Sequence, residues 1–214
     1  MAIPPFGLEG LLVLPPRCRA VIVFAHGSGS SRNSPRNKHV AAALQRAGFG
    51  TLLFDLLTEA ESSSRDNVFD IDLLAERLTL ATEWLGRRME RIAPRIGYFG
   101  ASTGAAAALV AAAQPDCAVQ AIVSRGGRPD LAGAALPHVT APTLLIIGGL
   151  DREVLALNRQ AMAHMRCKAT LQIVPGATHL FEEAGTLEQV IGHASTWFSH
   201  YLLQSEAADV SGQD

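Results

Sequence analysis

Residues 95–108 read RIGYFGASTGAAAA, and this stretch decides the fold. Its mostly apolar beginning predicts a buried strand at 95–99, and its alanine-rich end predicts a helix at 103–113. Between them stands Gly-x-Ser-x-Gly, with the serine at Ser102. Between a strand and a helix, this pattern predicts a sharp turn that exposes the serine hydroxyl at the edge of a sheet. The alternative interpretation is a serine that only caps the helix.

The same alternation of strand and helix continues on both sides of this stretch. Short apolar runs predict further strands at 8–14, 20–25, 51–56, 121–124, 143–147 and 170–174. Helical patterns lie between them at 36–47, 71–91, 153–165 and 187–203. Continuous apolar runs, such as AVIVFA at 20–25, are typical of strands that are covered on both faces. The chain therefore predicts an α/β fold, a doubly wound, mostly parallel sheet of about seven to eight strands flanked by helices.

The composition is that of a globular domain. Of the 214 residues, 48% are hydrophobic and 18% are charged, which excludes a disordered chain. The formal net charge of −2 lacks the basic excess that is typical of nucleic-acid binding. We expect one domain over residues 1–204, with a short polar loop at 59–65, and a disordered polar tail over residues 205–214.

The cysteines and the apolar runs bear on the cellular compartment. Cys18, Cys117 and Cys167 are far apart, so they predict neither a disulfide framework nor a zinc site, and reduced thiols suit a cytoplasmic protein. The longest apolar run, at 105–113, is about half as long as a membrane span, and the N-terminus lacks a signal peptide's basic stretch. We therefore expect a cytoplasmic protein that binds neither membrane nor nucleic acid and holds no metal or cofactor, with its oligomeric state open.

Two further polar residues follow predicted strands. Asp151 stands four residues after the strand at 143–147, and His179 stands five residues after the strand at 170–174. Because ligands bind beyond the carboxyl ends of parallel strands, these residues are expected near the serine. The order serine, aspartate, histidine is that of the α/β-hydrolase catalytic triad.

Each member of this set also has a plainer interpretation. Asp151 could cap the next helix, and His179 could be an ordinary loop histidine. Glu182 or Glu183, which follow the histidine closely, could replace Asp151 as the acid that orients it.

A glycine-rich loop follows the strand at 20–25 and reads His26-Gly27-Ser28-Gly29. Such a loop is expected to supply one of the two backbone N–H groups that bind an oxyanion, since glycine lets the backbone come close to a reacting carbonyl. A dinucleotide-binding loop is the alternative. It is not favoured, because Arg32 stands where the third glycine of that motif belongs.

Taken together, these motifs resemble the α/β-hydrolase superfamily, and the small size and short span between residues 124 and 143 resemble its lidless, dienelactone hydrolase-like branch. The resemblance covers about residues 8–203. It implies Ser102 as nucleophile, His179 as base, Asp151 as the orienting acid, and the backbone N–H groups of Ser28 and Thr103 as the oxyanion hole. Dienelactone hydrolases proper use a cysteine nucleophile, so the serine is a departure from that pattern.

Arg125 directly follows the strand at 121–124 and is expected to line the pocket, where it would bind a carboxylate or similar anion on the substrate. The alternative is a structural ion pair with Asp130. Arg32 and Arg36, beside the glycine-rich loop, are expected at the surface.

The sequence therefore predicts a serine hydrolase that cleaves a small ester, lactone or related acyl substrate. Two alternatives remain: a non-catalytic ligand-binding or scaffold protein on the same fold, and an acyltransferase that uses the same triad.

Overall fold

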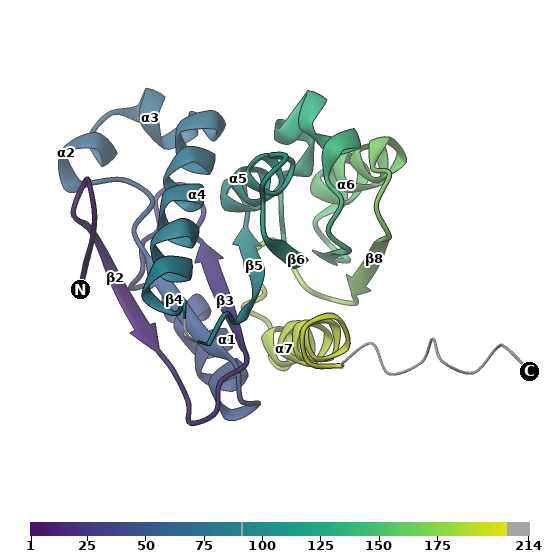
Figure 1. Ribbon diagram of the computed structural model, residues 1–214. Coiled ribbons are helices and arrows are strands. Elements are labelled where there is room, and N and C mark those ends of the chain that lie inside the picture. The colour runs from purple at the N-terminus through teal and green to yellow at the C-terminus, as the bar shows by residue number, and fades with distance from the viewer. Residues whose placement is uncertain (91, 205–214) are drawn as a thin grey trace, which may run out of the picture.

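The computed structural model describes residues 1–90 and 92–204, and within this part eight strands form one sheet (Figure 1). The strand order is β1-β2-β4-β3-β5-β6-β7-β8. Neighbouring strands are parallel from β4 to β8, while β2 is antiparallel to both β1 and β4. The strands are β1 Ala2–Ile3, β2 Leu8–Val13, β3 Ala20–Ala25, β4 Gly50–Phe54, β5 Arg95–Ala101, β6 Val119–Arg125, β7 Thr143–Gly148 and β8 Ala169–Val174. The predicted α/β fold with a mostly parallel sheet is confirmed.

Helices cover both faces of the sheet. Helices α4, α5 and α6 pack on one face, and α1 and α7 pack on the other (Figure 1). The helices are α1 Pro35–Arg46, α2 Glu59–Ser62, α3 Arg65–Phe69, α4 Ile71–Arg88, α5 Thr103–Ala112, α6 Arg152–His164 and α7 Thr186–Phe198. A 3₁₀ segment spans Pro129–His138, and a π-helical turn spans Ser199–Leu203.

Strand β3 shows why an unbroken apolar run is needed between two helical layers. All six of its residues are buried. Val21 and Val23 belong to the core under α4 and α5, whereas Ile22 and Phe24 belong to the core under α1 and α7. Because successive side chains of a strand point to opposite faces, burying both faces requires every position to be apolar.

The structure differs from the sequence prediction at residues 59–65. The polar loop expected there contains α2 and the start of α3. Thr58 and Glu61 form a capping box: the Thr58 hydroxyl accepts the Glu61 N–H at 3.2 Å, and the Glu61 carboxylate accepts the Thr58 N–H at 2.9 Å. These reciprocal bonds satisfy N–H groups at the start of the helix, which lets a polar segment become helical. The helix expected at 187–203 is α-helical only to Phe198.

Other expectations have mixed outcomes. The 3₁₀ segment between β6 and β7 leaves no room for a lid, as predicted. All three cysteines lie in the described part of the chain and are free thiols. Among the described residues, no helix combines the length and the apolar character needed to cross a bilayer. The tail expected at 205–214 lies outside the described residues.

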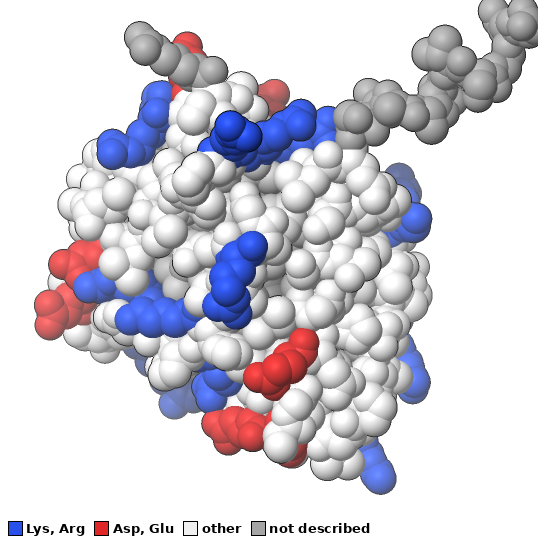
Figure 2. Space-filling view, turned by 90° about the horizontal axis from the view of Figure 1, so that it is seen from below, with Lys and Arg blue, Asp and Glu red and all other residues white. Residues whose placement is uncertain are grey.

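Charged side chains are spread over the surface. Seen from below the view of Figure 1, Lys and Arg form small groups separated by neutral surface, with acidic side chains at the left edge, in the lower part and at the top (Figure 2). The visible part of this face therefore carries no continuous basic stripe.

Candidate active site

Ser102 occupies a strained turn between β5 and α5. Its backbone has φ 51° and ψ −123°, a conformation that non-glycine residues rarely adopt and that the surrounding structure must enforce. A Cβ atom at Gly100 would lie 2.5 Å from Ala105 Cα, and one at Gly104 would lie 2.3 Å from the Ala25 carbonyl oxygen. Both glycines of the motif are therefore sterically required. The Ser102 side chain makes no helix-capping hydrogen bond, which removes the plainer interpretation of this residue.

His179 and Asp151 meet where the loops after β7 and β8 come together. His179 Nδ1 lies 2.6 Å from Asp151 Oδ2. The loops can approach because Gly148 has no side chain: a Cβ atom there would lie 2.4 Å from the Ala177 carbonyl oxygen. Asp151 stands at the start of α6 but makes no capping bond with its side chain, so its carboxylate serves the histidine.

The two glutamates considered as alternative acids are engaged elsewhere. Glu182 Oε1 accepts a bond from Arg36 Nη1 at 2.8 Å. Glu183 accepts bonds from the Thr178 hydroxyl at 2.6 Å and the Thr178 N–H at 3.1 Å. The geometry therefore favours Asp151 as the partner of His179.

Ser102 and His179 line one cleft of about 570 Å³. No hydrogen bond joins Ser102 Oγ to His179 within residues 1–90 and 92–204. In unliganded enzymes such bonds are often long and tighten when substrate binds. Gly126, just after β6, lies under the histidine, since a Cβ atom there would be 3.6 Å from His179 Cε1. The ends of neighbouring strands β5 and β6 thus carry the serine and support the histidine.

The two expected oxyanion donors lie beside Ser102, but one of them is already engaged. The Ser28 N–H donates to the Thr103 hydroxyl at 2.9 Å. Thr103 is the first residue of α5, where backbone N–H groups have no partner within the helix. Gly27 packs on the elbow, because a Cβ atom there would lie 3.0 Å from Ser102 Cβ. The oxyanion role stays a prediction, and the bond made by the Thr103 side chain is a feature that the motif did not reveal.

Arg125 lines the same cleft, as expected, and the alternative, an ion pair with Asp130, is not formed. Arg128 holds Asp130 through two bonds of 2.9 and 2.7 Å. Arg125 is only 7% exposed, and its Nη2 reaches Asn37 Oδ1 at 3.5 Å. Its Nε and Nη1 are buried without a partner in the described part of the chain. Burial, with a contribution from nearby Arg36, lowers the pKa of Arg125 to about 10.

The two arginines expected at the surface are half-buried instead. Arg36 lines the cleft, and its Nε is buried without a partner among the described residues. Arg32 forms ion pairs with Asp55 and Glu9, and its backbone N–H donates to Asp55 Oδ1 at 2.6 Å. The side chains of Arg32 and Arg36 are 24% and 33% exposed, respectively, so both lie at the edge of the surface while their inner atoms contact the chain.

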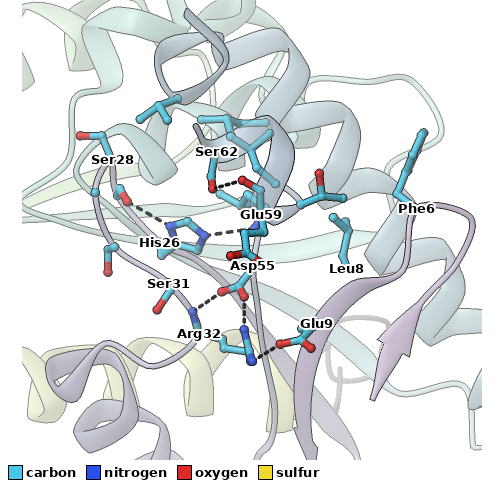
Figure 3. A pocket seen from close by; sticks show the side chains of 18 of the residues that line it. Phe6, Leu8, Glu9, His26, Ser28, Ser31, Arg32, Asp55, Glu59 and Ser62 are labelled. Carbon is cyan, nitrogen blue, oxygen red and sulfur yellow. Dashed lines mark hydrogen bonds and ion pairs between the residues drawn. The ribbon is translucent and has the colours of Figure 1, made fainter. Parts of the chain in front are cut away.

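A second cavity of about 670 Å³, drawn in Figure 3, is lined by the same loop of residues 27–31 that lines the cleft. At its centre the His26 ring links two strand ends. His26 Nδ1 lies 3.0 Å from the Gly27 carbonyl oxygen, and Nε2 accepts the Leu56 N–H at 3.1 Å. Burial lowers the pKa of His26, so the ring is neutral. The described residues contain no group of three or more His, Cys, Asp and Glu placed to hold a metal ion.

The strand order, the strained serine elbow and the histidine–aspartate pair define an α/β-hydrolase. A model of the dienelactone hydrolase family matches residues 8–196, so the chain belongs to that family. It is 54% identical to a dienelactone hydrolase from Anabaena variabilis, with a TM-score of 0.90 over 94% of this chain and 95% of that one.

More distant structures share the fold. A serine hydrolase without a lid from Xanthomonas campestris is 22% identical, with a TM-score of 0.76 over 95% of this chain and 94% of that one. Est1E from Butyrivibrio proteoclasticus is 15% identical, with a TM-score of 0.75 over 95% of this chain and 99% of that one.

Two Mycobacterium tuberculosis proteins, provisionally named phosphoribosyl transferases, are each 59% identical over 198 residues. The match covers 92% of this chain and 45% of each relative. The chain therefore spans less than half the length of these relatives.

Proposed function

We propose that the chain is a serine hydrolase that cleaves a small ester, lactone or related acyl substrate through an acyl-enzyme. The observation that carries this proposal is a strained serine sharing one cleft with a histidine whose Nδ1 is 2.6 Å from an aspartate. A scaffold protein has no need to keep a serine at positive φ, a conformation that costs about 1–3 kcal/mol.

The reaction assigns one role to each side chain. Ser102 Oγ attacks the acyl carbon while His179 Nε2 takes its proton. Asp151 holds the Nδ1–H of His179, which fixes the tautomer and stabilises the imidazolium. His179 then gives the proton to the leaving alcohol oxygen as the acyl carbon–oxygen bond breaks. A water molecule then attacks the acyl carbon of the acyl-enzyme while His179 takes its proton. His179 returns that proton to Ser102 Oγ as the acyl carbon–Oγ bond breaks, which releases the acid and regenerates the serine.

The oxyanion formed in both steps would be bound by the N–H groups of Ser28 and Thr103. Each such donor contributes roughly 3 kcal/mol to the transition state. Because the Ser28 N–H is bonded to the Thr103 hydroxyl, the oxyanion must share this donor or displace that hydroxyl.

The size and openness of the cleft support a small substrate. Its volume of about 570 Å³ falls within the usual range of ligand pockets, and the short 3₁₀ segment between β6 and β7 leaves it uncovered. The Anabaena relative is named for hydrolysis of a dienelactone, which makes lactones a first substrate class to test. The name of the mycobacterial relatives describes proteins more than twice as long as the matched segment, so we propose hydrolysis for this segment alone. A cytoplasmic location and the absence of membrane or nucleic-acid partners stay predictions.

Labelling with a fluorophosphonate probe tests the nucleophile without knowledge of the substrate. We expect stoichiometric labelling at Ser102, found by peptide mass spectrometry, and none in Ser102→Ala. Hydrolysis of a panel of p-nitrophenyl esters and small lactones should accompany the labelling. A folded wild-type protein that neither labels nor hydrolyses any of these would favour the scaffold alternative.

A further inference from the structure

One end of the catalytic cleft is built as a site for an anion. Helix α1 begins there with Ser34 as its cap and Pro35 as its first residue, and both line the cleft. The first turn of this helix contains no acidic residue. The N-terminus of a helix carries roughly half a positive charge, which favours phosphate and carboxylate groups. In α1, Pro35 has no N–H and the Asn37 N–H is bonded to the Ser34 hydroxyl at 3.3 Å, so the charge of the helix end contributes more than its N–H groups do.

Two arginines face this helix end. Arg36 belongs to the first turn of α1, and Arg125 is the last residue of β6, with its Nη2 3.5 Å from Asn37 Oδ1 of the same turn. The proximity of the two guanidinium groups contributes to the lowered pKa of Arg125. Among the described residues, Arg125 has no carboxylate partner, because Asp130 forms its ion pair with Arg128. Glu182 pairs with Arg36 only at the exposed rim, where an ion pair contributes little.

A buried guanidinium without a counter-ion is costly in a folded protein. Removing one partner of a buried ion pair strongly destabilises a protein, because it leaves a buried charge uncompensated. Arg125 is in that state, with Nε and Nη1 both buried and unpaired within the described residues. Arginines of this kind are explained when a bound ligand supplies the missing charge.

We propose that Ser34, Arg36, Asn37 and Arg125, here called the anion site, bind a phosphate monoester carried by the acyl substrate. Two guanidinium groups, the helix end and the single Glu182 carboxylate leave about 1.5 positive charges. A phosphate monoester carries about 1.5 to 2 negative charges and three acceptor oxygens near neutral pH. A carboxylate has one negative charge and two oxygens, which is too few to neutralise and bond both guanidinium groups and the helix end.

The anion site lies within reach of the nucleophile. Ala101, which precedes the serine, pairs in register with Arg125 across β5 and β6. The Ser102 N–H also donates to the Arg125 carbonyl oxygen at 3.3 Å. A phosphate held by the arginines would therefore fix a short substrate in one pose, with its acyl carbon at Ser102. This inference rests on the proposed hydrolysis only for the reaction at the serine, not for the binding of phosphate.

Thermal unfolding with inorganic phosphate tests the binding step on its own. We expect phosphate to raise the Tm of the wild-type protein and of Ser102→Ala, because a ligand stabilises the state that binds it. Arg125→Met should lose this rise, and without phosphate it should be at least as stable as the wild type, since it removes an unpaired buried charge. Arg125→Lys should keep part of the rise. Arg87→Met is the matched control: it removes one positive charge from an exposed site on α4 and should behave like the wild type.

The same measurement can overturn the proposal. An equal rise in Tm for Arg125→Met and the wild type would place phosphate elsewhere. A fall in the Tm of phosphate-free Arg125→Met would make Arg125 a structural residue. Because Ser102→Ala is included, a protein that binds phosphate but hydrolyses nothing would contradict only the proposed hydrolysis.

Matched substrates test the chemical class. Three esters of one alcohol and equal acyl length should end in a methyl, a carboxylate or a phosphate group. We expect kcat/KM to be highest for the phosphate ester, about 10–100-fold above the methyl ester, since hydrogen bonds to charged groups contribute this much. Arg125→Met should lower kcat/KM for the phosphate ester by a larger factor than for the methyl ester, so that the ratio between the two esters falls toward one. Equal rates for all three esters, or a preference for the carboxylate ester, would contradict the proposal.

Discussion

The two cavities beside the loop of residues 27–31 each contain a histidine, but the two rings differ in how many of their nitrogens are hydrogen-bonded. His26, in the second cavity, has one ring nitrogen near the Gly27 carbonyl oxygen and the other bonded to the Leu56 N–H. His179, in the cleft, has only its Nδ1 bonded, to Asp151, and within the described residues its Nε2 makes no hydrogen bond. The first ring is a fully satisfied structural link, whereas the second keeps one nitrogen available to move a proton.

The arginines of the two cavities differ in the same way. Arg32 of the second cavity is neutralised by Asp55 and Glu9 (Figure 3). Arg125 of the cleft has no carboxylate partner among the described residues. Identical residue types are therefore paired with carboxylates in one cavity and left without them in the other, within the described residues.

The largest difference between the cavities should appear when a serine is removed from each. Ser102→Ala should lower kcat by about 10⁶-fold while the protein remains folded. Ser62→Ala, which removes a hydroxyl bonded to the Glu59 carbonyl oxygen in the second cavity, should keep wild-type kcat. Steady-state hydrolysis of a p-nitrophenyl ester measures both. Activity above a few per cent in Ser102→Ala would contradict the serine mechanism.

An aspartate replaced in each cavity should separate catalysis from stability. Asp151→Asn should lower kcat by about 10⁴-fold, because the amide favours the wrong tautomer of His179. Asp55→Asn should instead lower the Tm with kcat unchanged, since it weakens the ion pair with Arg32. Glu183→Gln serves as the control for the competing acid and should retain activity. If Glu183→Gln were the more damaging change, the assignment of Asp151 would be wrong.

The loop shared by the two cavities should respond to Thr103. Thr103→Val keeps the side-chain shape but removes the acceptor of the Ser28 N–H, so the exposed loop loses its tie to the elbow. We expect kcat to fall about 10-fold with KM little changed, as a partial loss of an oxyanion donor. Thr103→Ser should restore activity. A rise in kcat for Thr103→Val would mean that the hydroxyl competes with the oxyanion.

The smallest expected effect is the pH dependence of stability from His26. Burial lowers its pKa in the folded state, so below the unfolded-state value of about 6.5 the unfolded chain binds more protons than the folded one. Stability therefore decreases as the pH falls through that value, by up to about 1.4 kcal/mol per pH unit. Urea unfolding at pH 7.5 and 5.5 should show a smaller loss for His26→Gln than for the wild type. Equal losses would show that His26 does not contribute.

Most strands and helices could be predicted because the patterns that indicate them lie within short stretches of the sequence. The run at 20–25 predicted β3 with the bounds that the structure has, and the alanine-rich stretch after Ser102 predicted α5 to within one residue. The two-residue strand β1 is too short to leave a periodic pattern. Helix α2 did leave a signal, Thr58 and Glu61 at capping-box spacing, although its serines favoured a loop.

The sequence by itself determined the serine elbow and the order of Ser102, Asp151 and His179, each after its own strand. A sharp turn needs glycines at fixed spacing from its serine, and that steric requirement acts over a few neighbouring residues. The sequence favoured Asp151 over Glu182 and Glu183 as the acid that faces His179, and the approach of two loops at Gly148 is what brings that carboxylate to the ring.

Only the tertiary structure decided which polar groups are satisfied. The bond between the Ser28 N–H and the Thr103 hydroxyl joins residues 75 positions apart. The pairing of Arg128 with Asp130, which leaves Arg125 without a carboxylate, depends on how the segment after β6 folds. Strand and helix patterns follow from hydrophobic periodicity along the chain, whereas the partner of a charge depends on which segments pack together, and no local pattern records that.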